Sequence, residues 1–248
     1  MSRIDIPKAL LERFDVSAPR YTSYPPIPYW PNVDAAQWER WAARPQQPGS
    51  SLSLYVHIPF CRARCTYCAC FVIISGRQDV AERYAGTVCR EMELVASRVG
   101  GGAPVRQFHL GGGTPTFLSR ASIAALVESA KRRFPFDSNA EMSIEVDPRT
   151  IGEGGLTWIR ELGFNRLSLG IQDFDETVQR AVNRVQPFTQ VRTLMTEARS
   201  QAFLSVNFDL IYGLPHQSRA TFARTLEQIL ELFYGRKMEK TVVLQKKD

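Results

Sequence analysis

The sequence predicts an α/β fold in which a parallel sheet curls into part of a barrel, and three observations lead to this prediction. Five short apolar runs alternate with longer segments whose apolar residues recur every three or four positions. Strand–helix units in series are typical of a parallel sheet covered by helices, and right-handed crossovers of one kind curl such a sheet. The chain after residue 50 is too short for the eight units of a closed barrel. We therefore expect a partial (β/α) barrel.

The first fifty residues are predicted to form an irregular arm that ends in a linker. Prolines and aromatic residues crowd the segment 20–31, and this density of proline excludes a long regular element. One short helix is expected at 33–41, and 44–51 has the composition of a linker. The division into domains is therefore an arm and linker at 1–50 and a partial barrel at 51–232.

The barrel part begins with a strand and then alternates. Strands are predicted from length and apolar content at 52–57, 105–110, 142–146, 166–171 and 204–211. Helices are predicted after each strand from apolar residues at helical spacing, namely Val80, Tyr84, Val88, Met92 and Val95; Ile123, Leu126, Val127, Ala130 and Phe134; Leu156, Ile159 and Leu162; 178–182, then Val191, Leu194, Met195 and Ala198; and Phe222, Leu226, Ile229 and Leu230.

Composition limits the class of protein and of ligand. Hydrophobic residues make up 44% and charged residues 23% of the chain, as in ordinary globular proteins. No apolar run approaches the ~20 residues of a membrane-spanning helix, and the first residues lack a signal-peptide core, so a cytoplasmic protein is expected. The formal charge of +6 suits a small polycarboxylate or phosphate ligand. Nucleic acid is not expected, because no basic run interleaved with aromatics precedes the last residues.

Polar residues close the predicted strands, where parallel barrels carry their ligand sites. They are His57, His109, Glu145, Asp147, Gln172, Asp173, Asn207 and Asp209. Capping of the following helix explains Asp147 and Asp173 as well as function does. Glu145 and Asp209 lie inside apolar runs, where an ionised carboxylate needs a partner.

Four of the five cysteines fall within ten residues, at Cys61, Cys65, Cys68 and Cys70, directly after the first predicted strand. Cysteines this close cannot join distant segments as secreted disulfides do, so they indicate metal binding or redox chemistry. The fifth, Cys89, lies on a predicted helix and is expected to pack as a small apolar residue.

Three kinds of site remain open for these cysteines. Structural zinc usually takes two separated pairs of ligands, and here all four lie in one short loop. A dithiol redox site would use Cys65 and Cys68 without needing the flanking cysteines. An iron–sulfur cluster takes thiolate ligands, and the Cys-x3-Cys-x2-Cys spacing can hold three corners of a [4Fe–4S] cube and leave one iron open. Cys70 lies only two residues after Cys68, so it is assigned elsewhere.

The segment Gly111-Gly112-Gly113-Thr114-Pro115-Thr116 follows the second predicted strand. It is not a dinucleotide fingerprint, because Thr116 stands at the place of the last glycine, and no Gly-Lys-Ser/Thr makes it a phosphate loop. Glycines here let the backbone approach a ligand closely. A tight strand-to-helix turn is the alternative.

The cysteine spacing after the first strand of a barrel resembles the signature of radical S-adenosylmethionine enzymes. The resemblance implies that Cys61, Cys65 and Cys68 hold a [4Fe–4S] cluster whose free iron binds the amino and carboxylate groups of S-adenosylmethionine. One-electron cleavage then yields a 5′-deoxyadenosyl radical that abstracts hydrogen from the substrate. A similar glycine-rich segment in these enzymes takes the amino group of S-adenosylmethionine.

Further segments resemble one family of these enzymes, the oxygen-independent coproporphyrinogen III oxidases (coproporphyrinogen dehydrogenases). The likeness is carried by Cys70 and by residues 20–25, 57–61, 111–116, 144–148, 163–168, 170–174 and 209–215. The related haem chaperones share the barrel and the three cysteines, but they lack the Arg-Tyr-Thr-Ser-Tyr-Pro arm and the Cys-x-Cys ending that this chain has. A chaperone-like member of the superfamily, a haem- or partner-binding protein and a structural zinc protein remain the alternatives.

The family resemblance implies oxidative decarboxylation of two propionates of coproporphyrinogen III to vinyl groups, which gives protoporphyrinogen IX in haem synthesis without oxygen. It also implies two molecules of S-adenosylmethionine. The positions that match contacts to the first are Tyr55, Gly112 and Glu145. The positions that match contacts to the second are Tyr67, Gly113, Thr114, Gln172, Arg184 and Asp209. The expected partners are this tetrapyrrole and an electron-donor protein, and the expected state is a cytoplasmic monomer.

The sequence departs from the family pattern in two places. Phe71 stands where the family usually has a polar residue. After Leu232 the family continues into a sixth strand and a helical C-terminal domain, whereas the tail at 233–248 does not match. The chain is therefore expected to be truncated, to lack the last barrel strand and to have little oxidase activity.

Overall fold

The computed structural model describes residues 7–14, 29–99, 102–233 and 239–246. The chain divides into two compact units, residues 1–41 and 42–248. The first carries α1 (Lys8–Phe14) and ends within α2 (Ala35–Ala42).

The helix α2 confirms the short helix expected at 33–41. The backbone amide of Gln37 donates to the Asp34 carboxylate at 2.6 Å, which caps the start of this helix. The Arg-Tyr-Thr-Ser-Tyr-Pro motif of the predicted arm lies outside the described residues.

The second unit is built on a six-stranded sheet whose neighbouring strands are all parallel. Along the sheet the strands are β1 (Leu52–Ile58), β4 (Val105–Gly112), β5 (Phe136–Val146), β6 (Arg166–Gln172), β7 (Ser205–Tyr212) and β8 (Glu239–Lys246). Their order in the sheet is their order in the chain, so every right-handed crossover places its helix on the same face. The partial (β/α) barrel is confirmed, and all five predicted strands are present.

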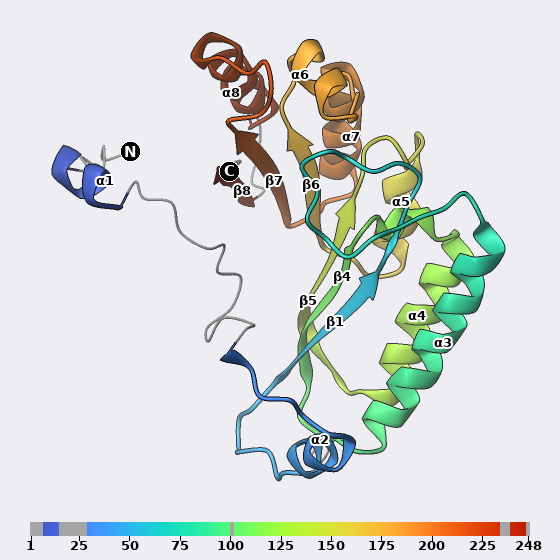
Figure 1. Ribbon diagram of the computed structural model, residues 1–248. Helices are drawn as coiled ribbons and strands as arrows, with labels where there is room; N and C mark the ends of the chain where they lie inside the picture. Colours follow the sequence, from blue (N-terminus) through green and yellow to red (C-terminus); the bar gives the residue numbers. More distant parts are fainter. Residues whose placement is uncertain (1–6, 15–28, 100–101, 234–238, 247–248) are drawn as a thin grey trace. The chain divides into compact units, whose positions relative to one another are not determined.

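The helices match the predicted spacing of apolar residues. They are α3 (Gln78–Ala96), α4 (Arg120–Arg133), α5 (Gly155–Glu161), α6 (Glu176–Ala181), α7 (Phe188–Ser200) and α8 (Arg219–Phe233). Figure 1 shows α3 and α4 side by side along the sheet. A second, two-stranded sheet of β2 (Phe60–Cys61) and β3 (Ile73–Ile74) was not predicted, because two residues carry no periodicity.

Side chains alternate across the sheet, and this alternation separates the core from the site. In β6, Leu167, Leu169 and Ile171 are buried, while Ser168 and Gln172 are only half-buried on the other face. Successive residues of a strand point to opposite faces. The apolar set packs against the helices with other fully buried side chains, including Phe108, Leu110, Ile144, Phe164 and Phe208. The polar set is left for the opposite, concave face.

The prediction that the last barrel strand is missing was wrong. Residues Glu239–Lys246 form β8, which pairs with β7 in parallel register from Ser205 opposite Glu239 to Tyr212 opposite Lys246. The run Thr241-Val242-Val243-Leu244 is rich in β-branched residues, and such residues favour strands. Because this run follows α8, it completes one more strand–helix–strand unit and covers the edge of β7.

One helix of the barrel is capped by its neighbour. The first residue before α5 is Gly154, which has φ +75° and offers no side chain. The Glu197 carboxylate on α7 accepts the backbone amides of Leu156 at 2.8 Å and Thr157 at 3.1 Å. A negative group at this end also complements the helix dipole.

Within the described part of the chain, no helix has both the length and the apolar character to cross a membrane.

Candidate active site

The carboxyl ends of the strands converge at one edge of the sheet and bring polar residues onto neighbouring strands. The register places His109 between Tyr55 on one side and Ser143 on the other. It places Ser168 between Glu145 and Asn207 in the same way. His109, Glu145 and Asn207, three of the polar residues predicted near the strand ends, therefore lie on neighbouring strands, and the cysteine loop follows β1.

The cysteine loop is closed at its neck by the small sheet. The backbone amide of Ile73 donates to the Pro59 carbonyl at 2.7 Å, and that of Ser75 donates to the Cys61 carbonyl at 3.0 Å. The amide of Thr66 donates to the Val182 carbonyl at 3.2 Å and ties the loop to the end of α6. These bonds hold the segment that carries the cysteines against the barrel.

The cysteines differ in their surroundings. All five are free thiols; Cys65 is buried, Cys61 and Cys68 are half-buried, and Cys70 is exposed. Cys89 is half-buried against the core, with its thiol 3.8 Å from the Ala125 carbonyl, as expected for a packing residue.

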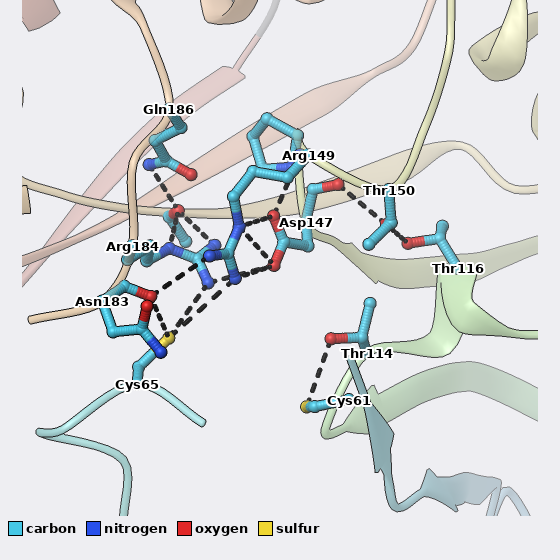
Figure 2. Close-up of polar contacts among 12 residues, drawn as sticks. Cys61, Cys65, Thr114, Thr116, Asp147, Arg149, Thr150, Asn183, Arg184 and Gln186 are labelled. Carbon is cyan, nitrogen blue, oxygen red and sulfur yellow. Dashed lines mark hydrogen bonds and ion pairs between the residues drawn. The ribbon is translucent and has the colours of Figure 1, made fainter. Parts of the chain in front are cut away.

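Two guanidinium groups face the sulfur of Cys65. Arg149 Nη2 and Arg184 Nη1 each lie 3.9 Å from Cys65 Sγ. Both also pair with the Asp147 carboxylate, Arg149 Nη2 at 2.7 Å and Arg184 Nη1 at 3.1 Å from Oδ2. Figure 2 shows the two guanidinium groups close together between Asp147 and Cys65. The carbonyl of Asn183 lies 3.9 Å from the same sulfur.

The charges around Asp147 decide its ionisation. Burial alone would raise the pKa of this carboxyl, but the hydrogen bond from Arg149 and the charge of Arg184 outweigh burial and hold the pKa below its ordinary value. Asp147 also accepts the backbone amide of Arg149 at 3.0 Å, so it shapes a turn and caps no helix. The sequence left open whether Asp147 caps a helix or belongs to the site, and the structure favours a place in the site.

Asp173 belongs to the scaffold instead. Its carboxylate accepts hydrogen bonds from Gln217 Nε2 at 2.5 Å, from the Thr225 hydroxyl at 2.7 Å and from the backbone amide of Asp175 at 2.7 Å. Asp175, and not Asp173, caps α6. The buried Asp173 thus joins β6 to α8 and to the loop before it.

The other two cysteines of the motif have different neighbours. Cys61 Sγ lies 3.4 Å from the Thr114 hydroxyl, and burial raises the pKa of the Cys61 thiol. A hydrogen bond with Cys70 lowers the pKa of Cys68 to about 6, and the positive charges of Arg64 and Arg184 act in the same direction. The motif therefore combines one thiol near cations, one near a hydroxyl and one that favours the thiolate form.

The glycine segment lies against the polar strand ends because no side chain fits there. A Cβ on Gly111 would lie 2.8 Å from Glu145 Oε1 and from His109 Nε2. Gly112 has φ +118°, and its backbone amide donates to Glu145 Oε2 at 3.1 Å. The ring of Tyr55 stacks on His109 with centroids 5.7 Å apart. Tyr55, Gly112 and Glu145, the first predicted set, thus lie together around His109.

Tyr55 and His109 are fixed by further polar contacts. Burial and, second, the charge of Glu145 raise the pKa of Tyr55 to about 12. The Tyr55 hydroxyl lies 2.9 Å from His57 Nδ1, and His57 Nε2 lies 3.0 Å from the Phe71 carbonyl. The backbone of Phe71, whose side chain is exposed, is therefore connected to β1 through His57.

The second predicted set is brought together in part. Gln172 and Arg184 meet over Gly170, where a Cβ would lie 2.9 Å from Gln172 Nε2 and 3.0 Å from Arg184 Nη2. Gln172 has φ +66°, and its Oε1 is buried without a hydrogen-bond partner. Such an orphaned acceptor beside a polar site suits a ligand that donates a hydrogen bond. Gly113 and Thr114 lie at Cys61 instead.

Asp209 and Tyr67 are the remaining residues of the second predicted set. Asn207 Nδ2 donates to Asp209 Oδ1 at 3.0 Å, and burial raises the pKa of Asp209. Tyr67 packs on the small apolar cluster that includes Val178 and Leu214, and burial raises its pKa as well.

Sequence reasoning missed Arg149 and Asn183. Both contact the Cys65 sulfur through long contacts of 3.9 Å. The signal for Arg149 was its place two residues after Asp147, directly past the end of a predicted strand. Among the described residues, no three His, Cys, Asp or Glu side chains converge where a single metal ion could be held.

Comparisons with known proteins give the family. A model of the radical SAM superfamily matches residues 55–229. The oxygen-independent coproporphyrinogen III oxidase of Escherichia coli is 43% identical over 233 residues, which are 94% of this chain and 50% of that protein. The protein of the same name from Pseudomonas aeruginosa is 41% identical over 226 residues, 90% of this chain and 49% of that protein. The chain thus spans about half the length of the curated relatives it matches.

Solved structures agree with the sequence comparison. The coproporphyrinogen III oxidase of Escherichia coli, described as a radical SAM enzyme, superposes with a TM-score of 0.88 and 39% identity, covering 100% of this chain and 54% of that one. The radical S-adenosylmethionine methyltransferase TsrM from Kitasatospora setae superposes with a TM-score of 0.56 at 16% identity, covering 77% and 36%, which shows a shared fold alone. Because the matched stretch includes the cysteine loop, the glycine segment and the strands that carry the site, this chain belongs to the radical SAM superfamily.

Proposed function

We propose that this chain is the radical SAM part of an oxygen-independent coproporphyrinogen III oxidase. The observation that carries the proposal is the 43% identity to the Escherichia coli protein of that name over 94% of this chain. The activity would convert two propionates of coproporphyrinogen III to vinyl groups. The relatives compared above bear the oxidase name, which favours this activity over that of a haem chaperone.

The residues present fit an iron–sulfur cluster. Cys61, Cys65 and Cys68 would hold it, since each thiolate of a cube binds a different iron and need not converge on one point. Gly113 leaves room beside Cys61, where a Cβ would lie 3.0 Å from the sulfur. Bound there together with S-adenosylmethionine, the cluster would supply the one-electron chemistry that generates an organic radical.

The chain itself supplies binding groups and charge. We assign Tyr55, Gly112 and Glu145 to a first molecule of S-adenosylmethionine. We assign a second set to a second molecule: Tyr67, Gly113, Thr114, Gln172, Arg184 and Asp209. In this set Gln172 and Asp209 offer acceptors that suit the hydroxyl and ammonium donors of S-adenosylmethionine. The orphaned Gln172 Oε1 supports this assignment. The formal charge of +6 favours a substrate with four carboxylates. The proposal includes an electron-donor protein as partner and a cytoplasmic monomer as the working state.

Anaerobic reconstitution with iron and sulfide tests the proposal. The chain is expected to turn brown, to bind about four irons and, once reduced, to release 5′-deoxyadenosine from S-adenosylmethionine. Consumption of coproporphyrinogen III is then measured beside the Escherichia coli enzyme as the positive control. A colourless protein that holds one zinc ion would contradict the proposal, and so would stoichiometric haem binding without consumption of coproporphyrinogen III.

A further inference from the structure

We propose that Arg149 is a positioning residue that, together with Arg184, holds positive charge against the Cys65 sulfur and so makes the cluster easier to reduce. The inference rests on the proposed function, because it needs a cluster on Cys61, Cys65 and Cys68. It concerns two side chains that approach the same sulfur at the same distance, 3.9 Å from each guanidinium.

The Arg149 side chain is locked in place and is not a mobile surface cation. Its Nε donates to Asp147 Oδ1 at 3.0 Å and its Nη2 to Oδ2 at 2.7 Å, which is the fork geometry of a strong arginine–carboxylate pair. A third donor, Nη1, lies 3.4 Å from the Asn183 carbonyl. The side chain is 26% exposed, against 7% for Asp147.

The Arg184 side chain is anchored from the opposite direction. Its Nη2 and Nε donate to the Gly170 carbonyl at 2.7 and 3.2 Å. Its Nη1 then serves Asp147 at 3.1 Å and points to the Cys65 sulfur. The side chain is only 10% exposed, so water screens its charge weakly.

The charges in this cluster do not cancel. Asp147 carries one negative charge and the two arginines carry two positive charges, which leaves one positive charge beside Cys65 before any ligand binds. Of the three motif cysteines, Cys65 is the most buried, and the other two lack this double contact: Cys61 faces a threonine hydroxyl and Cys68 faces Cys70. Both guanidinium groups of this cluster therefore contact the same ligand sulfur, that of Cys65.

Positive charge at a ligand sulfur acts on reduction. Reduction adds one electron, and so one negative charge, to a thiolate-bound cluster, with the electron supplied by the reductant. Net charge near the cluster and hydrogen bonds to its sulfurs are among the factors that set its potential. A fixed cation and two N–H donors at Cys65 stabilise the form with the extra electron more than the form without it, so they raise the midpoint potential.

Redox titration of the reconstituted protein, followed by the electron paramagnetic resonance signal of the reduced cluster, tests the inference. R149M removes one positive charge and should shift the midpoint potential to a more negative value than in the wild type. R149K keeps the charge and should restore most of the shift. D147N removes the negative charge and should move the potential in the opposite direction. R166M is the matched control, because Arg166 also pairs with a carboxylate, that of Glu141 at 2.7 Å, but lies at the amino end of β6.

The midpoint potential is expected to shift in opposite directions in R149M and D147N, which makes the test decisive. Opposite shifts in R149M and D147N, with no shift in R166M, support the inference. A wild-type potential in R149M overturns it while the proposed function stands. If R149M does not load a cluster, D147N decides alone, and a potential that does not rise in D147N overturns the inference. A wild-type chain that binds no cluster overturns the proposed function as well.

Discussion

The backbone of Gly113 lies so close to Cys61 that a Cβ at this position would be 3.0 Å from the cysteine sulfur. The same Cβ would be 2.9 Å from the Phe60 carbonyl oxygen, which belongs to the backbone and cannot turn away. The glycine segment and the cysteine loop therefore form one packed unit. In this unit the third glycine provides the space beside a thiol.

The substitution G113A is expected to impair cluster binding. The added methyl group must displace the Phe60 carbonyl or the Cys61 side chain, and a displaced ligand side chain lowers metal affinity by roughly tenfold or more. Iron and sulfide per chain after reconstitution measure the effect. The control is G152A, since a Cβ on Gly152 meets nothing within 4 Å. Equal iron content in G113A and G152A would show that Cys61 tolerates the shift.

The five cysteines should separate into two groups when each is replaced by alanine. C61A, C65A and C68A are expected to lose the cluster, because each removes one of three thiolate ligands. C70A and C89A should keep their iron, since Cys70 is exposed and Cys89 packs against the core. Iron analysis and the visible absorption of the reconstituted variants distinguish the groups. Full iron content in any of the first three variants would contradict the three-thiolate assignment.

The fold was predictable because its signals are local and periodic. The apolar runs at 105–110 and 166–171 gave β4 and β6 within two residues, and the helical spacing from Val80 to Val95 gave α3. The strand-end rule placed Glu145 and Gln172 on one edge, since parallel strands share their direction. The strand at Glu239–Lys246 was not predicted, because the tail after Leu232 does not match the family pattern, although Val242 and Val243 favour a strand.

The pair of arginines at Cys65 was not predictable in the same way. Arg149 and Cys65 are 84 residues apart, and Arg184 and Cys65 are 119 apart. No periodicity connects such positions, and an arginine after a strand is ordinary on a surface. Only the packing of the loop against the ends of β5 and β6 decides which guanidinium groups meet the sulfur. Asp173 shows the converse, because a strand-end carboxylate proved to be part of the scaffold.

The ion pairs of Asp147 should make stability depend on pH at its acidic end. The folded pKa of this carboxyl is held below its ordinary value of about 3.9. Its contribution is therefore fully present above that ordinary value and is lost as pH falls through the lower folded pKa. D147N leaves the buried Arg184 and the half-buried Arg149 without their shared partner and should cost about 3 kcal/mol at neutral pH.

Urea unfolding of wild type and D147N from pH 7 down to pH 3 measures this dependence. The difference in the free energy of unfolding should be largest at neutral pH and shrink below about pH 4. E128Q is the control, because Glu128 pairs with Arg132 at the surface, where both side chains are more than 60% exposed, and the substitution should change stability little. A difference between wild type and D147N that stays constant down to pH 3 would rule out this linkage.

Asp209 should show the opposite dependence on pH. Burial raises the folded pKa of this carboxyl, so ionisation costs stability in the folded chain. The free energy of unfolding should therefore fall as pH rises from the ordinary value through the raised folded pKa, and it should stay lower above that range. D209N removes this cost and is expected to melt at a higher temperature than wild type at neutral pH when no ligand is bound.

The same substitution removes a charged acceptor and should weaken binding of S-adenosylmethionine by about 1.5 kcal/mol, roughly tenfold. Thermal melts with and without S-adenosylmethionine measure both effects on one sample of reconstituted protein. If D209N were less stable than wild type without ligand and bound S-adenosylmethionine equally well, Asp209 would be a structural residue, and its burial would serve the scaffold as that of Asp173 does.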